Sequence, residues 1–459
     1  MTRRAAGPPG RRAGGPAHRR NVEAEGGRLA ALSNHDAIRV PAMEERAETR
    51  FWHPFADMGA VRNHELVITR GEDVWVYDSA ERRYLDATAS LWYCNVGHGR
   101  PEIAAAVAEQ FKQLEAYSAF GDFVTPVARE LTDTLADLAP MPAKIFLTSG
   151  GGEAIDSAAK IAVRHFSAIG QSDRTLLISR SAGYHGTNGF GTALAGIPAN
   201  REGFGPQVQT IQVPHDSLEG LEDAINQAGA ERVAAVFVEP VIGAGGVYPP
   251  LPGYIEGVAE ICKRSGALFV ADSVICGFGR LGTWFGVERF GVQPDMITFA
   301  KGVSSGYLPL GGVVVSDRVA EPFWRSPGGP MLRHGATYAA HAACCAAALA
   351  NIELLEREGL IPRGRELEGA LHDALAPLAS DHRVAEVRGG VGMLAAVEFS
   401  ADLLGSNPGA IGQVVMGARE RGVLVRGLGS GIAVSPPLTA TPEHFAMIHD
   451  AVSGALSAL

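Results

Sequence analysis

Short apolar runs alternate with helical stretches through the middle of the chain. The runs are residues 144–147, 175–178, 233–238, 267–271, 296–299 and 312–315, rich in β-branched residues and bounded by turn-forming residues. Such runs are typical of buried parallel strands. Helical stretches between them, such as 153–166, predict a layered α/β domain. Because ligands bind beyond the carboxyl ends of strands in such sheets, the residues after each run are candidate site residues.

The two ends of the chain show other patterns. Residues 67–68, 74–77 and 84–86 are strand-like pieces separated by turns, and Pro101 opens a helix with helically spaced apolar residues. The last third begins with an alanine-rich helix at 339–356 and adds short strands at 393–399 and 422–426, which indicates a smaller α+β domain. Residues 1–45, rich in Arg, Gly, Pro and Ala, predict a disordered tail.

Composition and charge narrow the class of protein. A chain of 459 residues and 48.1 kDa, with 46% hydrophobic and 20% charged residues, is typical of a globular protein of two or three domains. Residues 1–20 hold six arginines and no acid, so the rest of the chain has a net charge of −16. This acidity argues against nucleic acid as the main partner.

Cysteine usage and hydropathy suggest a cytoplasmic protein. The five cysteines show neither paired nor zinc-binding spacing, and we expect them to be reduced and buried. No apolar run reaches the length of a membrane helix, and the arginines at the start are not followed by the apolar core of a secretory signal. We therefore expect neither a membrane partner nor a metal site.

Polar residues of several kinds follow the predicted strands. The glycine-rich turn Gly150–Gly152 leads into a helix, where free N–H groups and the helix dipole favour an anion. Tyr184, in the loop after residue 178, could stack on a planar ligand. Glu239 and Asp272 end neighbouring runs, and a carboxylate there is costly unless it has a cationic partner.

Lys301 stands just after the run 296–299. A lysine in a partly desolvated cleft can have a lowered pKa and act as an imine-forming nucleophile. Singly, each of these residues is equally typical of a surface or salt-bridged position, but an anion turn, an aromatic, acids and a lysine at one edge of a sheet indicate a site.

Residues 277–282 match the dinucleotide pattern G-x-G-x-x-G. The match carries little weight, because that pattern must join a strand directly to a helix, and here neither neighbour is in place.

Longer stretches of sequence resemble the class III aminotransferases, which are pyridoxal-phosphate (PLP) enzymes of fold type I. The resemblance runs from about Phe51 to the C-terminus and is closest to ω-transaminases. It is carried by the following stretches: Trp52-His-Pro-Phe55, Ser90-Leu-Trp92-Tyr-Cys-Asn-Val-Gly97-His-Gly-Arg, Val270-Ala-Asp272-Ser-Val274-Ile-Cys-Gly-Phe-Gly-Arg-Leu-Gly282, Ala300-Lys301-Gly-Val-Ser-Ser-Gly-Tyr-Leu-Pro309 and His334-Gly-Ala-Thr337-Tyr338.

The resemblance implies a fold and an activity. We expect a large PLP-binding domain with a mostly parallel seven-stranded sheet at 96–345, and a small α+β domain formed by 46–95 and 346–459. The expected reaction moves an amino group from an amine or ω-amino acid to a keto acid, with pyruvate the favoured acceptor, by a ping-pong mechanism in a homodimer. An aminotransferase of the diaminopelargonate type, an aminomutase and a degenerate non-catalytic homologue are the alternatives.

The resemblance also implies roles for individual residues. Lys301 would hold PLP covalently and move the proton, and Asp272 would face the pyridine nitrogen. Thr337 and Phe120 would reach the neighbouring subunit's site, and Arg426 would bind the carboxylate of acidic substrates. The implied cofactor-binding set is Gly151, Gly152, Tyr184, His185, Glu239, Asp272, Val274, Lys301 and Thr337. The implied substrate set is Phe55, Trp92, Phe120, Tyr184 and Arg426.

Two departures from the family pattern concern the same site. The family usually has Ser-Gly-Ser at Gly150–Gly152, so two hydroxyl groups that could bind the phosphate are missing, at about 0.5–1.5 kcal/mol each. It also usually has a glutamate where Ser273 stands.

Overall fold

The computed structural model describes residues 49–459, so the tail expected at 1–45 lies outside the described residues. The chain divides into two compact units, Met1–Leu66 and Val67–Leu459. In the first, helix α1 (Met58–Val61) is capped by Asp57, whose carboxylate accepts a 2.9 Å hydrogen bond from the Gly59 N–H. In the same unit, the His53 Nε2 lies 2.7 Å from a carboxylate oxygen of Glu65.

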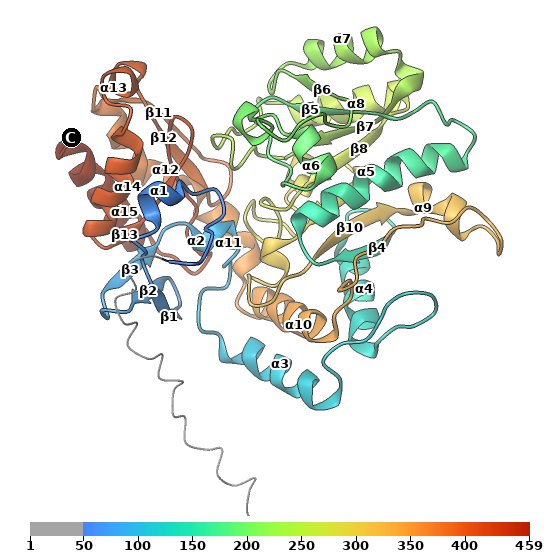
Figure 1. The fold of residues 1–459 in the computed structure, drawn as a ribbon, viewed down its shortest axis with the longest axis horizontal. Helices are drawn as coiled ribbons and strands as arrows, with labels where there is room; N and C mark the ends of the chain where they lie inside the picture. Colours follow the sequence, from blue (N-terminus) through green and yellow to red (C-terminus); the bar gives the residue numbers. More distant parts are fainter. Residues whose placement is uncertain (1–48) are drawn as a thin grey trace, which may run out of the picture. The chain divides into compact units, whose positions relative to one another are not determined.

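A seven-stranded sheet forms the centre of the second unit (Figure 1). Its strands stand in the order β4-β10-β9-β8-β7-β5-β6. They are β4 (Ala143–Thr148), β5 (Leu176–Arg180), β6 (Thr210–Val213), β7 (Val233–Val238), β8 (Leu268–Asp272), β9 (Met296–Phe299) and β10 (Gly311–Ser316). Every neighbouring pair from β9 to β6 is parallel. The sheet is therefore mostly parallel, as predicted.

Strand β10 corrects one detail of the prediction. We expected the run at 312–315 to be a parallel strand, but β10 is antiparallel to both β9 and β4. A parallel crossover needs about a dozen residues or more, usually with a helix. Between β9 and β10 the only regular element is the single 3-10 turn η4 (Lys301–Val303), so the chain reverses direction instead.

Helices cover both faces of this sheet, and successive strand residues contact different helices. Val270 of β8 packs in a buried cluster with α5, α6 and α9, whereas Phe269 and Ala271 face a second cluster with α3, α4, α7, α8 and α10. The helices are α3 (Pro101–Gln113), α4 (Pro126–Leu138), α5 (Gly151–Ala168), α6 (Gly189–Leu194), α7 (Leu218–Ala228), α8 (Tyr254–Ser265), α9 (Asp317–Trp324) and α10 (Ala342–Arg357). This two-sided burial explains why the central strands are apolar at most positions.

Segments from both ends of the second unit share one small sheet. Strands β1 (Ile68–Glu72), β2 (Trp75–Asp78) and β3 (Arg83–Asp86) form a meander, and β13 (Val423–Leu424) adds to β3 in parallel. A second antiparallel sheet has the order β11-β12-β15-β14. Its strands are β11 (Val384–Arg388), β12 (Ala395–Phe399), β14 (Arg426–Gly427) and β15 (Gly431–Val434).

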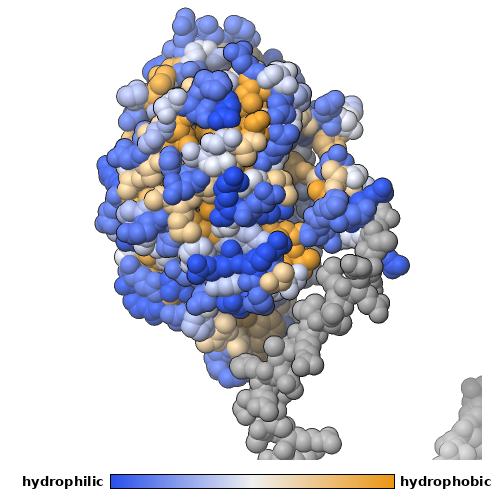
Figure 2. Space-filling view, turned by 90° about the vertical axis from the view of Figure 1, so that its left-hand side faces the viewer, coloured by the Kyte–Doolittle hydropathy of each residue, from blue (hydrophilic) through white to orange (hydrophobic). Residues whose placement is uncertain are grey.

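The helices around these small sheets are α2 (Ala89–Trp92), α11 (Leu360–Glu366), α12 (Glu368–Leu375), α13 (Ala401–Ser406), α14 (Ala410–Glu420) and α15 (Pro442–Ser457). On the face that carries α13 to α15, apolar groups form separate patches within a mostly hydrophilic surface (Figure 2). None of the helices within 49–459 is long and apolar enough to cross a membrane. The domain boundaries at 95/96 and 345/346 stay predictions.

Candidate active site

Three predicted site residues follow three adjacent strands. Glu239 comes directly after β7, Asp272 ends β8, and Lys301 lies just beyond β9. Since β7, β8 and β9 are neighbours and parallel, their carboxyl ends meet at one edge of the sheet. The electrostatic influence of both acids on Lys301 agrees with this proximity.

Asp272 is held in one orientation by donors on both oxygens. Its side chain is almost fully buried, and one carboxylate oxygen lies 2.7 Å from the His185 Nδ1. The other oxygen accepts hydrogen bonds from the Thr298 hydroxyl (3.0 Å) and the Val274 N–H (3.2 Å). Among the described residues, a histidine ring nitrogen is thus the side-chain nitrogen within hydrogen-bonding distance of this acid. We did not predict Thr298, although it stands opposite Asp272 in the register of β8 and β9.

The amine of Lys301 is easier to deprotonate than a free lysine. Burial lowers the pKa of Lys301 to about 8, although Asp272 and Glu239 oppose this shift. Its backbone φ of 49° lies in the left-handed region, which a non-glycine residue seldom adopts. The following turn holds this conformation, since the Val303 N–H donates to the Ala300 carbonyl at 3.2 Å. Near neutral pH, about one amine in ten is then uncharged.

Glu239 joins two loops at the site. Its carboxylate accepts hydrogen bonds from the Tyr184 N–H at 2.9 Å and the Gly243 N–H at 3.0 Å. Burial raises the pKa of Glu239. The cationic partner that we expected is thus largely replaced by two backbone donors, which satisfy a buried carboxylate without a salt bridge. Glu239 thereby fixes the start of the Tyr184 loop beside Asp272.

The glycine-rich turn adjoins the same residues. Helix α5 begins at Gly151, and within the described chain no acceptor pairs with the N–H of Gly151 or Gly152. A Cβ added to Gly151 would lie 2.9 Å from a Val274 methyl carbon and 3.6 Å from the Cβ of Ala300, the residue before Lys301. The free N–H groups of a long helix therefore open beside Val274 and Lys301, where an anion is favoured.

Arg426, on β14, brings a guanidinium to the site. It is partly buried, and its Nε has no hydrogen-bond partner within residues 49–459. Burial lowers the pKa of Arg426, and Tyr184 is the neighbour that opposes the shift. Burial likewise raises the pKa of Tyr184. Asp272 and Glu239 add to this rise, and Arg426 opposes it. An unpaired buried guanidinium is costly, so this position suits an anionic ligand.

Trp92 is buried in a cluster with Val247, Ile275 and Cys276, the last two of which follow Val274 in the chain. Its loop is strained, with φ values of 57° at Ser90 and 66° at Trp92. Asp86 holds the loop by accepting a 2.6 Å hydrogen bond from the Ser90 N–H. Phe55 is exposed and belongs to the first unit, so its role stays a prediction.

The two residues expected to reach a partner subunit are both exposed. Phe120 is 52% exposed, and its ring would be 3.5 Å from a Cβ added to Gly335, two residues before Thr337. The segment that contains Thr337 is fixed to α5, because the His334 Nε2 lies 2.8 Å from the Ser157 hydroxyl. The ring of His334 also stacks on Phe146, with centroids 5.8 Å apart.

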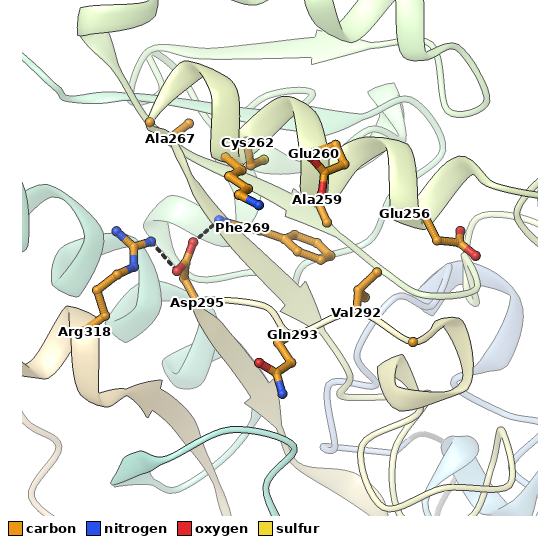
Figure 3. Close-up of a pocket in the computed structure, with 13 residues that line it drawn as sticks. Glu256, Ala259, Glu260, Cys262, Ala267, Phe269, Val292, Gln293, Asp295 and Arg318 are labelled. Carbon is orange, nitrogen blue, oxygen red and sulfur yellow. Dashed lines mark hydrogen bonds and ion pairs between the residues drawn. The ribbon is translucent and has the colours of Figure 1, made fainter.

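A cavity of about 760 Å³ lies at the amino ends of strands β8 and β9, opposite the ends that carry the site (Figure 3). Asp295, just before β9, bonds to Arg318 and accepts a 2.9 Å hydrogen bond from the Phe269 N–H at the start of β8. Among the described residues lining it, no buried side-chain polar atom lacks a partner. Its position at the amino ends of the strands separates it from Asp272 and Lys301.

Comparison with known proteins agrees with this geometry. The family model "Aminotransferase class-III" matches residues 58–456. The chain is 36% identical to a probable aminotransferase of Mycobacterium tuberculosis, over 91% of this chain and 94% of that protein. It is 35% identical to the putrescine–pyruvate aminotransferase of Pseudomonas aeruginosa, over 86% of this chain and 94% of that protein.

Solved structures match as well. An (S)-enantioselective ω-transaminase from Thermomicrobium roseum has a TM-score of 0.85 at 37% identity, covering 88% of this chain and 96% of that one. A PLP-bound amine transaminase from an uncultivated Pseudomonas species has a TM-score of 0.86 at 32% identity, covering 90% and 100%.

The chain is a PLP-dependent enzyme of fold type I. This class follows from the seven-stranded sheet, from the site at the carboxyl ends of its strands and from the structural matches. The match over nearly the whole described chain narrows the class: the chain belongs to the class III aminotransferases. Its cofactor is accordingly pyridoxal phosphate. The predicted fold class, enzyme class and cofactor are confirmed.

Proposed function

We propose that this enzyme is an ω-transaminase that moves the amino group of an amine or ω-amino acid to a keto acid, with pyruvate as the acceptor. The observation that carries the proposal is the partly buried guanidinium of Arg426, whose Nε has no hydrogen-bond partner among the described residues, at the site of a lysine whose pKa is lowered to about 8. The pyruvate-using relative of Pseudomonas aeruginosa supports this acceptor.

The described residues fit PLP. The N–H groups of Gly151 and Gly152, which have no acceptor in the part of the chain that the structure describes, suit a phosphate, and Asp272 offers a carboxylate in a fixed orientation for a protonated ring nitrogen. A Cβ at Gly151 would clash with Val274, which supports a glycine requirement where a ligand and the backbone approach closely. When bound, PLP supplies an electron sink for the carbon that loses its proton.

Lys301 supplies the movable base in this proposal. Its Nζ would hold the cofactor, and the same nitrogen, once released, would take the proton from the amine-bearing carbon of the substrate and deliver it to the C4′ carbon of the cofactor. The lowered pKa supports both tasks, since each needs an uncharged amine. Asp272, oriented by His185 and Thr298, keeps its charge directed at one position. Tyr184 and Val274 would cover the two ring faces.

Arg426 would bind the carboxylate of the keto acid through two N–H groups. It would move aside when an apolar amine enters, so one pocket would serve both half-reactions. Trp92, Phe55 and Phe120 would shape the remaining walls.

A homodimer with shared sites completes the proposal. Large apolar side chains are exposed on two segments that meet where Phe120 approaches Gly335. They are Phe111, Tyr117, Phe120, Phe123, Val124, Met331 and Tyr338. Exposed apolar side chains on such segments support a protein interface there. Thr337, also exposed, would contact the phosphate bound by the partner subunit.

Steady-state and single-turnover kinetics test the proposal. With amine donors and either pyruvate or 2-oxoglutarate, a ping-pong enzyme gives parallel double-reciprocal lines, and the enzyme with donor alone releases one carbonyl product per site. Lys301→Ala should abolish turnover. Intersecting lines, or full transfer to pyruvate by Lys301→Ala, would refute the mechanism, and a preference for 2-oxoglutarate would refute the acceptor. Sedimentation of the holoenzyme tests the dimer, and a monomer that transfers at full rate would contradict shared sites.

A further inference from the structure

The side chain of Asn188 occupies the space that a residue larger than glycine would fill at Gly152, in the glycine-rich turn before α5. A Cβ built on Gly152 would lie 2.8 Å from the side-chain oxygen of Asn188 and 3.3 Å from its Cγ. Asn188 is exposed, and its amide makes no hydrogen bond within the described chain. The family usually carries a serine at Gly152, so the Asn188 amide stands where that side chain would begin.

Helix α5 itself holds Asn188 in this place. Asp156, one turn after Gly152 on the same face of α5, accepts hydrogen bonds from the Phe190 N–H (3.0 Å) and the Gly191 N–H (3.2 Å). These N–H groups belong to the first turn of α6, which begins directly after Asn188 and lies beside α5 (Figure 1). The Asn188 carbonyl also accepts from the Thr192 N–H at 2.7 Å.

The loop before Asn188 packs equally closely on the turn. Gly186 has a φ of 85°, and a Cβ there would lie 2.9 Å from the Gly152 Cα. His185, its neighbour, is held by Asp272. The backbone on both sides of Asn188 is therefore fixed against the start of α5, and the freedom that remains is rotation of its side chain.

We propose that Asn188 is a cofactor-phosphate ligand, and that its amide replaces the hydroxyl group missing at Gly152. This inference rests on the proposed phosphate site at Gly151 and Gly152. A side-chain amide can rotate to direct its N–H₂ group at an anion, and a hydrogen bond to a charged group is worth more than one between neutral groups. Gly152 and Asn188 therefore depend on each other. A side chain at residue 152 would displace the Asn188 amide, and the amide fits only because residue 152 is a glycine.

Titration of the apoenzyme with PLP tests this proposal. Asn188→Ala should raise the Kd for PLP about tenfold, and Asn188→Asp should raise it further, because a carboxylate repels the phosphate. Aspartate also caps helices, so that variant keeps the start of α6. The ³¹P resonance of the bound phosphate should shift in both variants. Asn226→Ala, which changes an exposed asparagine on α7, is the matched control and should leave Kd and resonance unchanged.

Gly152→Ser tests the pairing itself. In the natural chain the new side chain meets the Asn188 amide, so PLP affinity should fall a few-fold. In the Asn188→Ala background the same substitution should increase PLP affinity and bring it close to the natural value, because the hydroxyl then has the space to itself. An effect of the same sign in both backgrounds would overturn the proposal.

Pyridoxal, which lacks the phosphate, separates this inference from the one on which it rests. If Asn188 binds the phosphate, its variants change the affinity for PLP and leave that for pyridoxal within about twofold. Equal losses for both ligands, or natural PLP affinity in Asn188→Ala and Asn188→Asp, would refute a phosphate ligand at Asn188. If the natural chain bound pyridoxal as tightly as PLP, the phosphate site at Gly151 and Gly152 would itself be wrong.

Discussion

The lowered pKa of Lys301 leads to a quantitative prediction for cofactor capture. With a pKa of about 8, roughly one amine in ten is uncharged at neutral pH, whereas an ordinary lysine of pKa near 10.5 has about one in three thousand. If the uncharged amine is the attacking species, Lys301 should capture PLP about 300-fold faster than its ordinary pKa would allow. The rate should increase about tenfold per pH unit up to pH 8 and then level off.

Stopped-flow absorbance of the apoenzyme mixed with PLP, from about pH 6 to about pH 10, measures this profile. Nα-acetyl-lysine under the same conditions corrects for the titration of PLP itself. Borohydride trapping and peptide mass analysis assign the adduct to Lys301. Asp272 is the strongest of the neighbours that raise the pKa of Lys301. Asp272→Asn should therefore move the midpoint of the pH–rate profile to lower pH. A corrected rate that still climbs tenfold per unit beyond pH 9 would refute the lowered pKa.

The same shift has a consequence for the stability of the apoenzyme. Because the folded-state pKa lies below the unfolded one, the unfolded chain binds more protons between about pH 8 and pH 10.5, and stability should increase across that window. At neutral pH the buried amine costs about 3 kcal/mol, so Lys301→Met should raise the free energy of unfolding by up to that amount. Urea unfolding at about pH 7 and about pH 10 checks both statements, and Lys263→Met, on the surface of α8, is the control.

Three further predictions concern single side chains. The hydroxyl of Ser273 is buried and has no partner within residues 49–459, so Ser273→Ala should leave the free energy of unfolding unchanged or raise it by up to about 1 kcal/mol in urea titrations; a loss above about 1 kcal/mol would contradict this. Arg426→Ala should raise the KM for pyruvate at least tenfold and change the KM for an apolar amine little; equal changes would rule out its selective role. His334→Ala removes the contact of the Thr337 segment with Ser157 and should weaken PLP retention in dialysis several-fold, whereas His382→Ala, at an exposed position, should not.

Local sequence was sufficient to predict most strands and the edge of the sheet that carries the site. A strand buried on both faces is apolar at most positions, so β7, β8 and β9 were visible as short, mainly apolar runs. Because the carboxyl ends of parallel strands lie together, the sequence alone predicted that Glu239, Asp272 and Lys301 are neighbours. The pattern at 277–282 was correctly given little weight, since in the structure it neither follows a strand directly nor begins a helix.

Local sequence did not predict two features of the sheet. These are the antiparallel direction of β10 and the short strand β6 at the edge of the sheet. Apolar runs look alike whichever way they run, so β10 was expected to be parallel, and β6 at the sheet edge has no fully apolar run. Direction follows from what the connecting segment can span, and edge strands are only partly buried.

The sequence by itself determined the chemistry of the site. It identified the glycine-rich turn suited to an anion, the acids and the lysine, and it showed that all of them follow predicted strands. The tertiary structure alone decided their partners. Thr298 and His185 were brought to Asp272, backbone donors to Glu239, and Asn188 to Gly152, by register and loop packing. These contacts join residues distant in the chain, and their geometry depends on distances of a few tenths of an ångström. Periodicity along one segment carries no information about such distances.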